Sequence, residues 1–241
     1  MLSLARLLVI LTALLPFAAS AADAPKFELG KEYKPVAVPQ PTSDPSKIEV
    51  MEVFAYSCPH CYAFDPVLKQ WLAKQPKDIN FVRLPHTLGH EENVVRNKAF
   101  YAAQMLGVAD KFHVALFSAV HTDHKPMATP EDLRELFAKD LGVPARDFDS
   151  AYSSFAVDGG YRRGDGMVRD MAIGSVPTLV IEGRYYTSPS SGGGFPQMLQ
   201  IADYLIAQAR AAKPRSTAAA EPAATPKKKK KAKAPAAPKT P

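Results

Sequence analysis

Cysteine is scarce in this chain: only Cys58 and Cys61 occur in 241 residues. A single pair excludes a framework of several disulfides and leaves a redox couple, one structural disulfide or part of a zinc site. Long apolar runs are also missing after the first 22 residues, so no stop-transfer segment follows. No internal repeat is visible, which argues against stacked repeats.

The N-terminal segment is the exception to this shortage of apolar runs. Arg6 supplies one positive charge, residues 7–19 are almost entirely apolar, and small residues follow at 19–22. This order is typical of a secretory signal peptide at 1–22, with an uncleaved anchor as the alternative. Because no cysteine follows the apolar stretch, a lipid-modified N-terminus is not expected. We therefore expect an exported protein whose cysteines meet an oxidising compartment.

The C-terminal segment from residue 213 contains mainly proline, alanine and lysine, with five consecutive lysines at 227–231. Nine basic residues against Glu221 give it a charge of +8; without this tail and Arg6, the formal +6 of the chain becomes −3. The basic balance therefore indicates no basic face elsewhere. We expect a disordered spacer over 213–241, with weak contact to anionic envelope surfaces as the alternative. Nucleic acid is not an expected partner, because the tail has no interleaved aromatic residues.

Between these ends, the pattern predicts an α/β core with an all-helical insertion. The apolar run Ile48–Ala55 predicts a central strand buried on both faces, and Pro59–Lys74 predicts a helix that leads to a second strand at Ile79–Leu84. These elements form a βαβ unit. The period then becomes that of helices, which are predicted at 91–106, 110–121, 129–142 and 146–154.

The return to the core is less regular. Residues 155–173 have helical apolar spacing, but four glycines between Gly159 and Gly166 each cost about 1 kcal/mol against alanine, so we expect a helix that is broken or starts late. A β-hairpin (178–187) and a final helix (196–211) follow. The expected division is a signal peptide, a first core part, a helical insertion, a second core part and a tail: 1–22, 23–88, 89–165, 166–212 and 213–241.

The two cysteines lie where the first strand passes into the first helix, in the motif Cys58-Pro59-His60-Cys61. Proline is favoured at the first helical position, which makes Cys58 the expected N-cap. Unpaired N–H groups and the helix dipole favour a thiolate there, and His60 can donate to or support the same sulfur. Cys61 lies one turn deeper and should be less acidic. We therefore predict that Cys58 attacks or is attacked, and that Cys61 resolves.

Together, this motif, the Val176-Pro177 pair before a strand and the helical block between them resemble the DsbA family of periplasmic thiol:disulfide oxidoreductases, over about Tyr33–Ala211. The resemblance implies a thioredoxin-like fold with a helical insertion. It also implies a cis peptide bond before Pro177, where the proline lies against the disulfide and helps to hold substrate; the sequence alone favours trans. The glycines of the long helix, the Gly/Ser-rich stretch 188–194 and the tail depart from the family pattern.

The resemblance also assigns a role to charged residues near the motif. Glu52 interrupts the buried strand, where a carboxylate is costly without a partner. Family members carry a buried acidic residue six positions before the first cysteine and a basic partner on the next strand, which implies Glu52 with Arg83. Asp65 is similar to a second acidic position, with a solvated helix-face charge as the alternative. The implied role of all three is to tune proton uptake and release at Cys61.

The activity implied by the resemblance is oxidation of newly exported proteins. A substrate thiolate attacks the Cys58–Cys61 disulfide and forms a mixed disulfide with Cys58, which a second substrate thiol then releases. A quinone-linked membrane oxidase resembling DsbB would restore the disulfide in the periplasm. No metal or organic cofactor is expected, and we expect a monomer. The DsbA family is already known for a low pKa of its first cysteine and a strongly oxidising disulfide. We therefore derive no value of the pKa or of the reduction potential from the residues.

Histidines offer one alternative for the cysteine pair. His86-x3-His90 follows the pair with ligand types and local spacings that zinc uses, although the intervening gap is longer than in small zinc fingers. Zinc also leaves the helix-cap position of the first cysteine unexplained. His121 and His124 lie near a helix end and are expected to be solvated or to interact with the helix dipole.

Two further alternatives keep a disulfide. A purely structural bridge is one, but a two-residue loop constrains little of the unfolded chain. A reductase or isomerase would run the same chemistry in the other direction. Isomerases of this type usually carry a dimerisation domain, for which no segment is seen here, and Val176 before Pro177 resembles the oxidase branch.

Overall fold

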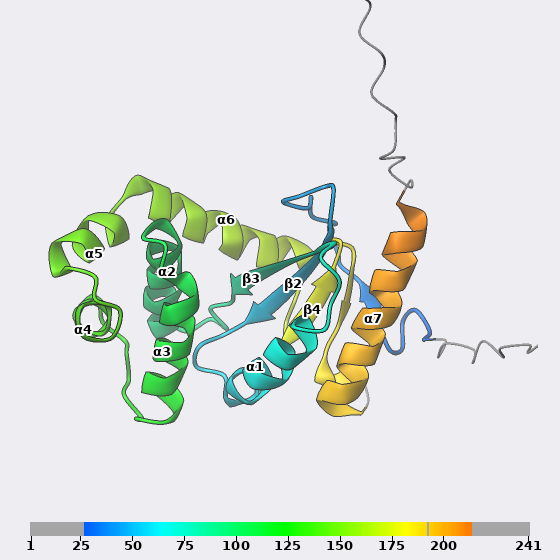
Figure 1. Ribbon diagram of the computed structural model, residues 1–241, viewed down its shortest axis with the longest axis horizontal. Coiled ribbons are helices and arrows are strands. Elements are labelled where there is room, and N and C mark those ends of the chain that lie inside the picture. Colours follow the sequence, from blue (N-terminus) through cyan, green and yellow to red (C-terminus); the bar gives the residue numbers. More distant parts are fainter. Residues whose placement is uncertain (1–26, 192, 214–241) are drawn as a thin grey trace, which may run out of the picture.

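The computed structural model describes residues 27–191 and 193–213. The predicted signal peptide and nearly all of the predicted tail lie outside the described residues. In the described part, a five-stranded sheet is surrounded by seven α-helices (Figure 1). No helix in these residues is both long and apolar enough to cross a bilayer.

The sheet is mixed and has the order β1-β5-β4-β2-β3. Only β2 and β3 pair in parallel; the other three pairs are antiparallel, including the predicted hairpin β4–β5. Every residue of β2 is buried, as predicted for a central strand. The strands span Lys34–Pro35 (β1), Ile48–Phe54 (β2), Ile79–Pro85 (β3), Thr178–Ile181 (β4) and Tyr185–Thr187 (β5).

Helices cover both faces of this sheet. On one face lie α1 (Pro59–Leu72) and α7 (Gly194–Ala212), whose apolar side chains form one core with β2 and β4 (Figure 1). Phe64 and Leu68 of α1 are wholly buried there, and each such side chain contributes about 1.5–3 kcal/mol. The other face is covered by α6 (Phe155–Met171). The burial of Phe64 and Leu68 fixes α1 against the sheet, and with it the cysteine motif at the start of the helix.

The predicted helical insertion lies between β3 and α6, and its core is continuous with the end of β2 and the two cysteines. Its helices pack beside the sheet, and Phe112, Leu116 and Phe137 are among their buried residues (Figure 1). A capping box at Thr129 begins α4, with Asp132 in the role of glutamate. The helices span Glu91–Met105 (α2), Ala109–His121 (α3), Pro130–Asp140 (α4) and Ala145–Tyr152 (α5), close to the predicted bounds.

The prediction that the glycines break α6 is wrong. This helix is continuous from Phe155 to Met171, and it runs through residue 165, where the sequence division separated the insertion from the core. Gly160 and Gly164 face Tyr101 of α2, and a Cβ at Gly164 would collide with the Tyr101 hydroxyl. Close packing of the two helices thus offsets the low helix propensity of glycine. Helix propensities do not include such packing between helices.

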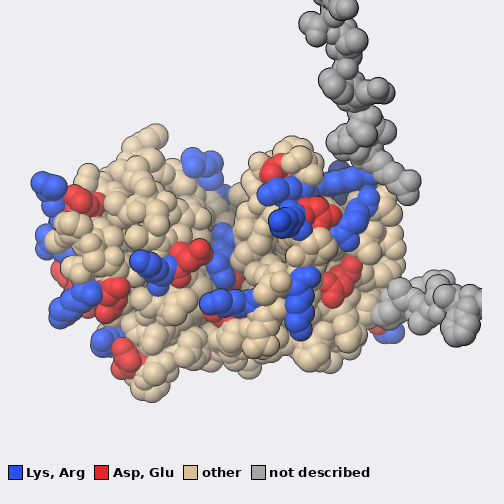
Figure 2. Space-filling view, in the orientation of Figure 1, with Lys and Arg blue, Asp and Glu red and all other residues tan. Residues whose placement is uncertain are grey.

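Charged side chains of both signs are scattered over the face shown in Figure 2. Neither lysine and arginine nor aspartate and glutamate gather into one large patch on this face. This agrees with the small net charge calculated for the chain without its tail, and it places no basic binding surface on this side of the molecule.

Candidate active site

Cys58 caps the N-terminus of α1, as predicted. Its backbone is extended (φ −88°, ψ 114°), Pro59 begins the helix, and its Sγ accepts a hydrogen bond from the N–H of Cys61 at 3.3 Å. Both thiols are free, and they differ in exposure: Cys58 is 8% exposed and Cys61 is fully buried. His60 is exposed on the first turn. Cys58 is therefore the more accessible of the two cysteines.

The two thiols have opposite pKa shifts. The hydrogen bond from the Cys61 thiol, together with the N–H groups of Cys61 and His60 and the charge of His60, lowers the pKa of Cys58 to about 6, although burial opposes this shift. The hydrogen bond to Cys58 and burial raise the pKa of Cys61, and the charge of Glu52 acts in the same direction. At neutral pH, Cys58 is a thiolate and Cys61 a thiol that donates to it. This is the asymmetry that the cap position predicts.

The loop before β4 lies directly against the first cysteine. The Val176–Pro177 peptide bond is cis, as the resemblance implies. The Cys58 Sγ lies 3.7 Å from the carbonyl oxygen of Val176. Residues distant in sequence thus meet at the reactive sulfur, with a backbone carbonyl beside it.

Glu52 and Arg83 are neighbours on adjacent parallel strands, as expected. The Arg83 Nε lies 3.4 Å from the Glu52 Oε2, but the alignment is not that of a hydrogen bond, and both atoms are without one. Burial raises the pKa of Glu52 to about 7, and the charge of Arg83 only partly offsets this effect. A carboxyl group that gains and loses a proton near neutral pH therefore lies beneath the cysteine helix.

Asp65 also contacts this guanidinium and is not a merely solvated charge. Its Oδ1 lies 3.4 Å from the Arg83 Nη2, and its side chain is 19% exposed. Burial raises the pKa of Asp65, but the hydrogen bond from His113 and the charge of Arg83 outweigh it, so the pKa is lowered. Arg83 thus lies between Glu52 in the interior and Asp65 near the surface. The cluster joins the buried side of the motif to solvent.

His113 completes this cluster and was not among the predicted site residues. The residue lies on α3, is 2% exposed, and places its Nε2 3.0 Å from the Asp65 Oδ1 and its Nδ1 3.3 Å from the Tyr56 hydroxyl. The available signal was its position on the apolar face of the helix, next to Phe112 and Leu116. A buried imidazole needs hydrogen-bond partners, so that position alone calls for a search for them.

Two further contacts tie the helical insertion to the loop before Cys58. The Asn93 amide donates to the Ser57 Oγ at 2.8 Å, and the His121 Nε2 lies 2.8 Å from the carbonyl oxygen of Tyr56. His121 is therefore a structural donor; it is neither simply solvated nor engaged with its own helix end. Sequence gave no sign of either pairing, because both join residues more than 30 positions apart.

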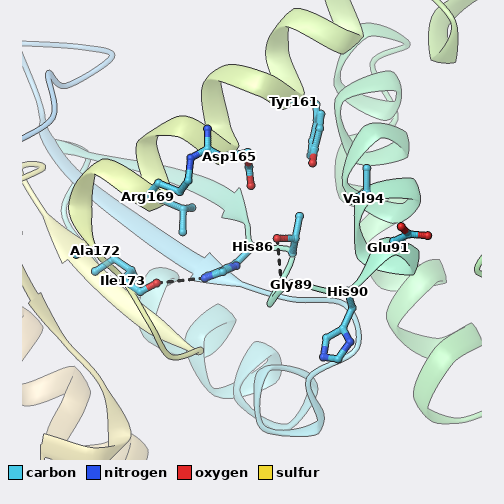
Figure 3. A pocket seen from close by; sticks show the side chains of 12 residues that line it. His86, Gly89, His90, Glu91, Val94, Tyr161, Asp165, Arg169, Ala172 and Ile173 are labelled. Carbon is cyan, nitrogen blue, oxygen red and sulfur yellow. Dashed lines mark hydrogen bonds and ion pairs between the residues drawn. The ribbon is translucent and has the colours of Figure 1, made fainter.

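The histidines of the zinc alternative lie elsewhere. His86 and His90 line a cavity of about 410 Å³ between the start of α2 and α6, and neither cysteine belongs to its lining. Figure 3 shows the two rings pointing in different directions. Both nitrogens of His86 are engaged, since Nε2 lies 3.1 Å from the Ile173 carbonyl and Nδ1 accepts from the N–H of Leu88 at 2.8 Å. No cluster of three or more metal-binding side chains exists among the described residues, so the zinc alternative is unsupported.

Comparison with known proteins agrees with this geometry. Residues 49–205 match the model of the DSBA-like thioredoxin domain. The chain is 42% identical over 207 residues to the thiol:disulfide interchange protein DsbA of Pseudomonas aeruginosa, which covers 85% of this chain and 97% of that protein. DsbA of Azotobacter vinelandii is 38% identical over 185 residues, covering 77% and 86%. A crystal structure of a Pseudomonas aeruginosa DsbA variant has a TM-score of 0.74 and 41% identity, covering 78% of this chain and 100% of that one.

The fold is thus thioredoxin-like with a helical insertion, and its one thiol pair lies at the start of α1. Sequence and fold both agree with the relatives. The chain belongs to the DsbA family of thiol:disulfide interchange proteins and is a thiol:disulfide oxidoreductase.

Proposed function

We propose that this protein oxidises thiol pairs in newly exported proteins by donating the Cys58–Cys61 disulfide. The observation that carries the proposal is the cap position of Cys58, where N–H groups and the Cys61 thiol hold a negative sulfur. A stabilised thiolate favours the reduced enzyme. Its disulfide is correspondingly oxidising, so transfer runs from the enzyme to the substrate.

The reaction consists of two exchanges. A substrate thiolate attacks the Cys58 Sγ; a substrate–Cys58 bond forms, the Cys58–Cys61 bond breaks, and Cys61 leaves as a thiolate that takes up a proton. A second substrate thiolate then attacks the substrate sulfur of this mixed disulfide, and Cys58 leaves as a thiolate. The substrate loses two electrons to form its disulfide, and the enzyme is reduced to the dithiol form. Cys58 is the sulfur that is attacked because it is the more accessible of the two: Cys58 is 8% exposed and Cys61 is fully buried.

The proton for the leaving Cys61 thiolate comes through Glu52, Arg83 and Asp65. The leaving Cys61 is fully buried and must be protonated there. Glu52, whose pKa lies at about 7, can supply that proton, and Arg83 and Asp65 extend from it towards solvent. No metal or organic cofactor has a role in either exchange.

Membership of the family supports the substrates and the cellular location that we propose. A Proteus DsbA, 26% identical and with a TM-score of 0.65, has been solved with a bound cysteine-containing peptide. We assign cysteine-containing exported proteins as substrates here, held near Val176 and Pro177 beside Cys58. The signal sequence supports a periplasmic location, and a DsbB-like membrane oxidase would restore the disulfide. We propose a monomer, whose tail makes at most weak contact with anionic surfaces.

Equilibration with glutathione tests the direction. The protein is incubated in buffers of graded reduced-to-oxidised glutathione ratio, and its two redox forms are separated after acid quenching and alkylation. The proposal predicts that the disulfide is largely reduced at ratios that leave ordinary structural disulfides intact. A couple as reducing as a structural disulfide would overturn the oxidase assignment and favour a reductase.

A further inference from the structure

His113 reaches from the helical insertion into the charged cluster of the core. It lies on α3, yet its ring contacts Asp65 on α1 and Tyr56 in the loop after β2. The rings of Phe54 and Phe117 lie edge-on to it, with centroids 5.2 and 4.7 Å away. The imidazole is therefore held on every side by elements of both parts of the fold.

The surroundings fix which nitrogen of this ring carries the proton. The Asp65 carboxylate only accepts, so the Nε2 must donate to it. Burial raises the pKa of Tyr56 well above its ordinary value, so its hydroxyl keeps its proton and can donate to Nδ1. Burial also lowers the pKa of His113, against the effect of Asp65. The ring is thus neutral, with the proton on Nε2.

The carboxylate that His113 holds shares a guanidinium with Glu52. Arg83 contacts Glu52 from β2 and Asp65 from α1, each at 3.4 Å, and the exposed Asp110 from α3 at 3.8 Å. The contact between Arg83 and Glu52 lacks hydrogen-bond alignment, so it is weaker than the contact between Arg83 and Asp65. An ionised Asp65 without its histidine donor would draw the guanidinium closer. Glu52 would then lose part of the charge that stabilises its ionised form.

We propose that His113 is a positioning residue for the thiol chemistry: by holding Asp65, it sets how Arg83 is shared between Asp65 and Glu52, and thereby the protonation of Glu52 beneath Cys61. The consequence for turnover rests on the proposed role of Glu52 as the proton donor to Cys61. The effect of His113 on the protonation of Glu52 is independent of that role. The helical insertion therefore contributes a side chain to proton handling in addition to flanking the active site.

The first test measures Glu52 directly. Glutamate is labelled with ¹³C at the carboxyl carbon, the Glu52 signal is assigned with Glu52→Gln, and it is titrated in the wild type, His113→Leu and His113→Gln. Leucine fills the space without a donor, whereas glutamine can still donate to Asp65. The proposal predicts a midpoint near 7 in the wild type, a rise of about 0.5 units or more in His113→Leu, and a return close to wild type in His113→Gln. Equal midpoints in all three folded proteins would overturn it.

A second measurement keeps the proposal testable if His113→Leu does not fold. In the wild type, ¹⁵N chemical shifts of the imidazole should report a neutral ring protonated on Nε2 at pH 7 and above. A ring protonated on Nδ1, or a cationic ring at pH 7 and above, would overturn the arrangement.

The pH profile of mixed-disulfide formation separates this proposal from the proposed function. In His113→Leu, the pH midpoint of the rate should shift by the same amount as the midpoint of Glu52. In Glu52→Gln, the pH-dependent step that is due to Glu52 should be absent. If the Glu52 midpoint shifts while the profile stays unchanged, His113 positions the cluster as proposed and the proton role of Glu52 is wrong.

Discussion

Cys58 and Cys61 are three residues apart on one helix, but different parts of the molecule decide their chemistry. The surroundings of Cys58 are mostly local: the first turn of α1 supplies its N–H groups, and the Val176 loop is the main contact from elsewhere. The groups beneath Cys61 come instead from β2, β3, α1 and α3, and include Glu52 and His113. Backbone geometry alone can thus create a reactive thiolate, whereas proton handling at its partner needs tertiary assembly.

Serine substitutions break the comparison most strongly. Cys58→Ser should lower turnover in a thiol-oxidation assay by about 10³-fold or more, because it removes the sulfur that forms the mixed disulfide. Cys61→Ser should lose turnover too, because it cannot form the disulfide that is donated. When it is offered a substrate disulfide instead, its Cys58 thiolate should form mixed disulfides that accumulate on non-reducing gels, because no neighbouring thiol can release the substrate. Full turnover by Cys58→Ser, or trapping by that variant, would reverse the assigned roles.

Removing the carboxylate beneath Cys61 should come next in size. The folded-state pKa of Glu52 is raised to about 7 from 4.5, so its ionisation opposes folding: stability is full below the unfolded pKa and falls as pH rises through the folded value. Glu52→Gln should lose this dependence, which amounts to roughly 3 kcal/mol. Urea unfolding of both reduced proteins at about pH 4.5 and pH 8 measures it. Parallel pH dependence in both would show that Glu52 ionises normally.

The contacts from the insertion to the Cys58 loop should matter less. Asn93→Ala removes the hydrogen bonds of its amide to the Ser57 hydroxyl and the Thr87 carbonyl, and the acceptor of the buried Arg96. These losses should destabilise the protein by about 1–3 kcal/mol in urea unfolding. Asn80→Ala is the matched control, since that amide bonds to Ser43 at the far end of the strand. Only Asn93→Ala should also change the alkylation rate of Cys58. If both variants alkylate at the wild-type rate, the insertion does not position the reactive loop.

The smallest effect is expected at His60. Its charge is the last of the influences on Cys58, after the hydrogen bonds from Cys61 and the backbone N–H groups. His60→Ala should therefore raise the pKa of Cys58 by only about 0.5 units, and added salt should shrink the difference because the side chain is exposed. Alkylation rates across pH at low and high salt check this. A rise of two units or more would make His60, and not the helix cap, the dominant influence.

The same contrast explains how much could be predicted from the sequence. The strand–helix corner, the cap at Cys58, the helical insertion and the hairpin follow from periodicity and local residue preferences. The pairing of Glu52 with Arg83 and the cis bond before Pro177 came only through family resemblance. His113 and Asn93 were missed, because their partners lie in other elements. The continuous α6 was missed because the benefit of Gly164 against Tyr101 depends on a neighbouring helix.

Direct titration of the two thiols tests the central claim, that one helix turn holds an acidic and a resistant cysteine. Thiolate absorbance near 240 nm is followed from about pH 3 to pH 10 in the reduced wild type, with Cys61→Ser to assign the signal. The account predicts one ionisation with a midpoint near 6, from Cys58, and no ionisation of Cys61 around its ordinary value. Two thiols ionising together near pH 9, or Cys61 ionising first, would contradict it.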